Sequence, residues 1–251
     1  MRALRRHAAL AAVLIASATP AWAGGGFAPG ETVEFTIDYL GIKMGDARIV
    51  VGQAEGPIWP VISRARTDGL AAIVDIREHL VSYWDSETLL PRGSDLQAIE
   101  VGDRHNDSAR FDRAAGTATI RITRKGKRVE NTYPLDPAAQ DFASAALWLR
   151  TQEFSENARF EIPVFTTKGT FVLQASVTGR ERVETPAGTF DAWKVEVRTA
   201  FDGNFAAKRD TTIWFSADEN KVPVRVSADF AVGSVVVKLV AYQPGGQMAR
   251  N

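Results

Sequence analysis

Few residues of this chain have types and spacing that could support chemistry. The 251 residues include three histidines and no cysteine. Asp103, His105 and Asp107 are spaced two residues apart, so on a β-strand their side chains would share one face. Such a trio of carboxylates and an imidazole could hold a divalent metal ion. Because the residues around it are polar throughout, the sequence favours a solvated turn and no metal site.

Other catalytic signals are missing from the sequence. His79 lies in a predicted strand at residues 76–81, where we expect a side chain at the core boundary and not a general base. There is no Gly-x-Ser-x-Gly elbow, no phosphate-binding glycine loop and no His-Glu-x-x-His motif. The sequence therefore favours a non-enzymatic protein with no catalytic residue and no cofactor. A cell-wall hydrolase that uses two facing carboxylates is the less favoured alternative.

Alternation of apolar and polar side chains is the dominant pattern in the segments that must position any site. Val33, Phe35, Ile37 and Tyr39 alternate with polar residues, which predicts a strand with one buried face. Clean alternation of this kind favours antiparallel pairing. The spacing of the turn residues predicts about ten to twelve strands. Similar alternation occurs at residues 118–123, 160–164, 171–178, 193–198, 222–230 and 235–239.

One segment has helical periodicity instead. Asp136 and Pro137 are suited to a helix N-terminus, and apolar residues recur at helical spacing from Phe142 to Leu149. The pattern predicts a helix over 137–151, with a second, shorter helical turn near 70–74. Because many strands must each bury one face, we expect a mainly β fold: a large curved antiparallel sheet, or open half-barrel, wrapped around one α-helix.

A curved sheet around a single helix is expected to leave an apolar cleft on its concave face. We predict that this cleft binds a lipid-like or other apolar component of the cell envelope. The alternative is that the same side chains fill the core of a structural or interaction module that has no small-molecule ligand. The predicted cleft residues are Phe35, Ile37, Tyr39, Phe142, Trp148, Trp193 and Phe230.

The N-terminus has the pattern of a secretory signal peptide. Arg2, Arg5 and Arg6 precede an apolar run at residues 8–18, and Ala21-Trp22-Ala23 is a small-x-small cleavage site. We expect residues 1–23 to be removed after Ala23, leaving a single β-rich domain over 24–251 in the periplasm or secreted. No later run approaches the roughly 20 apolar residues of a membrane-spanning helix. General secretion and twin-arginine export both remain open.

The charge balance excludes some partners. The chain contains 30 basic and 30 acidic residues, and loss of the signal peptide removes only basic ones, so we expect no binding to nucleic acid. Five positive side chains cluster at residues 121–128, around a predicted hairpin tip. A solvated tip is the favoured interpretation, with contact to anionic lipid head groups or polysaccharide as the alternative. An envelope protein is the other partner that we consider.

Several stretches in the same order along the chain resemble the bacterial envelope family DUF3108. The resemblance runs from about residue 30 to 239 and implies an exported β-rich domain without an established activity. It carries over no catalytic residue. At the level of analogy, such a shape is similar to the open half-barrels of periplasmic lipoprotein and lipid carriers. The stretches are residues 39–47 (YLGIKMGDA), 83–91 (YWDSETLLP), 144–150 (SAALWLR), 185–195 (TPAGTFDAWKV) and 213–218 (IWFSAD), with shorter pieces at 30–31, 111–112 and 222–224.

Overall fold

The computed structural model describes residues 26–68, 75–100, 102–166, 169–200, 211–229 and 233–246. They form one antiparallel sheet of fourteen strands and one helix, α1 (Phe142–Thr151). The predicted mainly β fold with a single helix is confirmed, and the number of strands is higher than the ten to twelve expected. The strands are β1 (Thr32–Tyr39), β2 (Ile42–Val51), β3 (Ile58–Thr67), β4 (Ile76–Asp85), β5 (Leu90–Glu100), β6 (Asp103–Asp112), β7 (Thr117–Arg124), β8 (Lys127–Pro134), β9 (Arg159–Thr166), β10 (Gly169–Thr185), β11 (Gly188–Ala200), β12 (Thr211–Ser216), β13 (Pro223–Asp229) and β14 (Ser234–Gln243).

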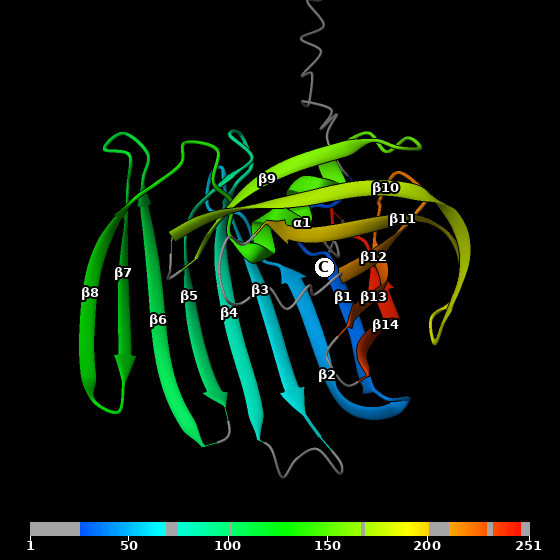
Figure 1. Ribbon diagram of the computed structural model, residues 1–251, viewed down its shortest axis with the longest axis horizontal. Coiled ribbons are helices and arrows are strands. Elements are labelled where there is room, and N and C mark those ends of the chain that lie inside the picture. The colour runs from blue at the N-terminus through cyan, green and yellow to red at the C-terminus, as the bar shows by residue number, and fades with distance from the viewer. Residues whose placement is uncertain are drawn as a thin grey trace, which may run out of the picture.

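The sheet consists of two meanders joined side by side. Strands β1 to β8 pair in sequence order, and so do β9 to β14. The two meanders meet where β1 pairs with β14, which leaves β8 and β9 as the two edges of the sheet. Figure 1 shows β9, β10 and β11 running across the view, while β3 to β8 stand upright. Because α1 connects β8 to β9, it carries the chain from one edge of the sheet to the other.

The strand periodicity sorts side chains onto two faces. Val33 and Phe35 of β1 are buried, as the alternation predicts, and Ile37 and Tyr39 are half-buried. On β3, Trp59 and Val61 are buried on the same face. Cross-strand partners lie on one face of a sheet, so this buried face continues through the pairing from β1 to β7. We call it the inner face and its opposite the outer face.

One predicted turn is a strand. The polar segment around His105 belongs to β6, which pairs with β5 on one side and β7 on the other. The prediction of a solvated turn there was wrong, because backbone hydrogen bonds to two neighbours can hold a strand whose side chains are polar. The predicted helical turn near 70–74 lies outside the described residues.

The helix begins later than the sequence suggests. Asp141 is the N-cap: its Oδ1 accepts a hydrogen bond from the Ser144 amide at 2.8 Å, and its own amide donates to Ser144 Oγ. Residues 137–138 form a turn instead, closed by the Ala138 amide on Asp136 Oδ1. Gln140 then makes a parallel bridge to Val164 of β9. The predicted start at residue 137 was therefore wrong, since pairing with the sheet extends the chain up to Asp141.

The helix lies between the two halves of the sheet. Leu147 packs with Trp59, Val61 and Trp84 of β3 and β4. On another side of α1, Ala145 and Leu149 pack with residues of β9 to β12, including Phe215. Two further apolar clusters fill the space where β1 meets β14 and where β6 and β7 meet β9. The helix and these side chains therefore occupy the space that the curved sheet encloses.

Candidate functional site

The structure distributes the predicted cleft residues over different parts of the protein. Phe35 is 4% exposed and belongs to the cluster between β1 and β14. Trp148 is half-buried and its ring makes an edge contact with Phe160 at 6.2 Å between centroids. Trp193 is half-buried beneath Arg180, whose guanidinium lies 4.3 Å from the centre of the indole ring. Each of these three aromatic residues packs against the protein's own side chains.

The remaining cleft candidates do not join them in one pocket. Ile37 and Tyr39 are half-buried on β1. Phe142, the first residue of α1, is 60% exposed and lies 5.8 Å from Phe171 of β10. Phe230 lies outside the described residues. A ligand-binding role for these residues stays a prediction, and the packing provides no common cavity for those that are described.

The polar trio of β6 does share a face, as its spacing requires of a strand. His105 is 4% exposed on the inner face, and its Nε2 lies 4.0 Å from Asp107 Oδ2. Burial raises the pKa of Asp107, opposed by the nearby His105 and Arg124. Nδ1 of His105 and Oδ1 of Asp103 are buried without a hydrogen-bond partner. Within the described ranges, no three His, Cys, Asp or Glu side chains are placed to hold a metal ion.

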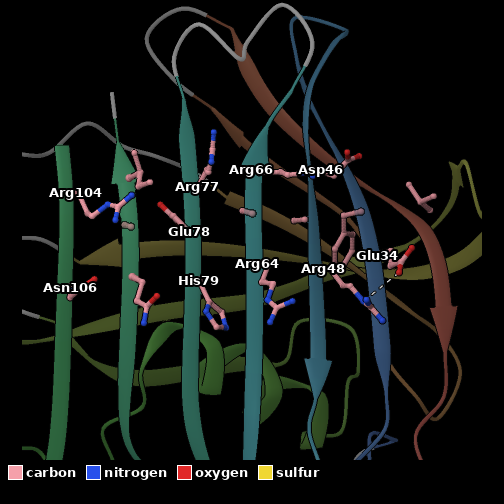
Figure 2. Close-up of a pocket in the computed structure, with 17 residues that line it drawn as sticks. Glu34, Asp46, Arg48, Arg64, Arg66, Arg77, Glu78, His79, Arg104 and Asn106 are labelled. Atoms are coloured by element: carbon pink, nitrogen blue, oxygen red, sulfur yellow. Dashed lines mark ion pairs between the residues drawn. The ribbon is translucent and has the colours of Figure 1, made fainter. Parts of the chain in front are cut away.

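A groove of about 970 Å³ crosses the outer face of β1 to β6. Figure 2 shows its polar side chains in two rows that run across the strands. The lower row follows direct cross-strand pairing and consists of Glu34, Arg48, Arg64, His79, Gln97 and Asn106. The upper row follows the pairing two residues further along and consists of Asp46, Arg66, Arg77 and Arg104, with the apolar Ile99 between the last two. The floor between the rows is the backbone of a third row, Ala47, Ala65, Glu78 and Ala98, whose pairing with Phe35 assigns its side chains to the inner face.

The groove is rich in guanidinium groups, and only some of them are neutralised. Arg48 pairs with Glu34 at 3.4 Å, and Arg77 pairs with Asp75 at 2.8 Å. Arg64, Arg66 and Arg104 are exposed and form no close ion pair or hydrogen bond with another described residue, although the charge of Arg66 acts on Asp46, which lies directly opposite it on β2. Asp46 is engaged by Lys43 at 2.8 Å, and this hydrogen bond lowers the pKa of its carboxyl group. Five arginines line the groove against three acidic residues, Glu34, Asp46 and Glu78, so it has an excess of positive charge.

The arrangement of these arginines works against the stability of the sheet. Arg48 is directly opposite Arg64, and Arg66 is directly opposite Arg77. Like charges at directly opposed positions of neighbouring strands are destabilising. An anion held between the two rows would relieve this repulsion, because Arg guanidinium groups bind carboxylate and phosphate oxygens in bidentate fashion.

A second hollow of about 670 Å³ lies on the hairpin of β10 and β11 beside β12. Arg180, Arg182, Glu181 and Asp191 line it, so charges of both signs are present. Glu181 accepts a hydrogen bond from the indole nitrogen of Trp214. This mixture of signs gives the second hollow no excess of charge comparable with that of the groove.

Comparison with known protein families identifies one whose model matches most of the chain. The model of the family described as a protein of unknown function, DUF3108, matches residues 34–240. The chain belongs to the DUF3108 family. The resemblance expected from the sequence is thus confirmed, and the match includes every residue that lines the groove.

Solved structures resemble this DUF3108 protein at low sequence identity. A β-barrel-like protein of the domain of unknown function DUF1849 from Brucella abortus is 12% identical, with a TM-score of 0.60, covering 88% of this chain and 100% of that one. A protein described as exported, with a YmcC-like fold, from Bacteroides fragilis has 12% identity, a TM-score of 0.38 and coverage of 88% and 99%. The Brucella structure thus supports the fold alone. No curated protein sequence matches the chain.

Sequence reasoning missed the groove of this DUF3108 protein. Arg64 and Arg66 are two residues apart, so the sequence alone could place them on one face of a strand. Their position beside Arg48, Arg77 and Arg104 depends on the register of five strands, which hydrophobic alternation does not give. The basic segment at 121–128 is a hairpin of β7 and β8, as predicted, and part of its charge is paired, as in Arg121 with Glu130 at 2.7 Å.

Proposed function

We propose that this protein is a non-enzymatic interaction module of the cell envelope that recognises its partner on the outer face of the sheet. The observation that carries the proposal is the filled interior: α1 and four apolar clusters occupy the space inside the curved sheet. The groove, by contrast, lies on the opposite face, and its lining consists mainly of charged and amide side chains, with Ile99 and Val240 among the apolar ones. Export is supported by the signal peptide pattern of residues 1–23. Among the described residues, no helix has the length and hydropathy to cross a membrane.

The packing around Trp148 argues against an acyl chain inside the sheet. A lipid would have to displace side chains that already contact one another, such as Leu147 against Trp84 and Leu149 against Phe215. Protein interiors are packed as densely as organic crystals, so opening a channel between these residues would forfeit many contacts. Binding of the predicted lipid-like ligand would therefore contradict the proposal, and the following test is designed to detect it.

The test is a titration of delipidated protein with palmitate and with lysophosphatidylcholine, followed by tryptophan fluorescence and by the thermal midpoint. We expect neither signal to change saturably, because Trp59, Trp84 and Trp148 are already packed. Trp148→Phe serves as the matched variant, since it keeps an aromatic ring at the helix surface. A saturable change that Trp148→Phe weakens would overturn the proposal in favour of a lipid carrier.

A further inference from the structure

The outer-face groove has the chemistry of a site for an extended polyanion. We propose that it binds an anionic oligosaccharide, with carboxylate groups on successive sugars, that lies across β2 to β6. The inference deepens the proposed function, on which it rests, by naming the class of partner that the outer face would take. Its basis is the two parallel rows of side chains shown in Figure 2, which together contain five arginines.

The positions of the arginines without a close ion pair favour a ligand with more than one anionic group. Arg64 and Arg66 lie on β3, whereas Arg104 lies on β6, three strands away. With neighbouring strands about 4.8 Å apart, these side chains start roughly 14 Å from one another across the sheet. A single phosphate or carboxylate would contact both ends only if the arginine side chains extended fully toward each other, so separate anionic groups suit this spacing better. A chain with several negative groups can engage Arg64 and Arg66 at one end and Arg104 at the other.

The uncharged lining favours a sugar chain over other polyanions. Gln97 and Asn106 are exposed in the lower row, where their amides can both donate to and accept from hydroxyl groups. Single-stranded nucleic acid would need aromatic side chains on which bases stack. Among the described lining residues, one is a Phe, Tyr or Trp: Phe35. It is 4% exposed, with its side chain on the inner face, so it offers no stacking surface in the groove.

Two further features fit a site that is complete only with its ligand. Nε2 of His79, in the lower row next to Arg64, is buried and has no hydrogen-bond partner. The opposed pairs Arg48 with Arg64 and Arg66 with Arg77 place like charges side by side. An anion in the groove would supply oxygen acceptors to these arginines and would offset the repulsion between them.

The experiment is isothermal titration calorimetry of the mature protein with tetragalacturonate, with neutral maltotetraose and with inorganic phosphate. The test variant is Arg64→Gln combined with Arg66→Gln. The control variant is Lys127→Gln combined with Arg159→Gln, which removes the same number of charges from the β8 hairpin and from β9. We expect tetragalacturonate to bind saturably and maltotetraose not to bind. We expect the test variant to weaken binding about tenfold for each arginine, since a charge-assisted hydrogen bond is lost at each site.

The thermal midpoint of the ligand-free test variant distinguishes lost contacts from misfolding. It is expected to equal or exceed that of the unmodified protein, because the two like-charge pairs that are removed, Arg48–Arg64 and Arg66–Arg77, outweigh the lost attraction between Arg66 and Asp46. Equal weakening in the control variant, equally tight binding of phosphate, or no binding of tetragalacturonate would overturn the inference. Those results would leave the proposed function standing. The proposed function is overturned by a different result, the binding of palmitate or lysophosphatidylcholine inside the sheet.

Discussion

Arg150 and Glu31 form an ion pair that is almost completely removed from solvent. The side chains are 3% and 1% exposed, and Arg150 Nη1 lies 2.6 Å from Glu31 Oε1. Arg150 also donates to the carbonyl oxygen of Asn220, while the Tyr242 hydroxyl donates to Glu31 Oε2 at 3.3 Å. These contacts join the end of α1 to the segment before β1 and to β14. Such a pair is costly to break by removing one partner, because the other charge is left buried.

Ionisation of the Tyr242 hydroxyl, which contacts Glu31, gives a test of this buried group of side chains. Burial, reinforced by the charge of Glu31, raises the pKa of Tyr242 from 10.0 to about 12. Because the pKa is higher in the folded than in the unfolded state, its contribution to stability is complete below pH 10 and is lost as the pH rises towards 12. We expect urea unfolding to show a loss of stability between pH 10 and about 12 that is smaller in Tyr242→Phe. Equal losses in both proteins would contradict this assignment.

Among the elements, α1 depends on a buried cap. Both carboxylate oxygens of Asp141 are used, one by the Ser144 amide and the other by Ser82 Oγ of β4 at 2.6 Å. The carboxyl group is desolvated, and burial raises its pKa. The cap thus fixes the start of the helix against the inner face of β4.

Two substitutions separate the cap from its charge. Asp141→Ala is expected to lower the free energy of unfolding by about 1–2 kcal/mol, because the Ser144 amide and Ser82 lose their acceptor. Asp141→Asn keeps an oxygen for the Ser144 amide and removes a buried charge, so we expect it to be as stable as the unmodified protein at pH 7. Urea unfolding measures both. A loss in Asp141→Asn as large as that in Asp141→Ala would contradict this expectation and show that the charge itself stabilises the cap.

The elements also show which parts of the fold the sequence determines locally. Alternation identified β1, β7 and β13, because one of their faces is buried against the core. It failed for β6, whose pattern around Asp103, His105 and Asp107 is polar on both faces and is held by its neighbours. The helix start was misplaced because Gln140 pairs with β9, a contact distant in sequence. The arginine groove could not be predicted for the same reason, since its rows exist only once five strands are in register.

At the scale of the whole molecule, one sheet presents two chemically different faces. Its inner face is covered by α1 and by side chains from both meanders, such as Trp84 and Phe215. Its outer face has the groove with Arg64, Arg66 and Arg104 exposed. We therefore expect ligands of this protein to bind on the outer face of the sheet and to be charged, not apolar.

Native mass spectrometry of the protein purified from its own cells without detergent measures its occupants directly. We expect the mass of residues 24–251 without any acyl-containing adduct, or with an adduct that disappears at high salt because screening weakens its contacts with the arginines. A stoichiometric lipid adduct that survives high salt and is removed by detergent would contradict a filled interior.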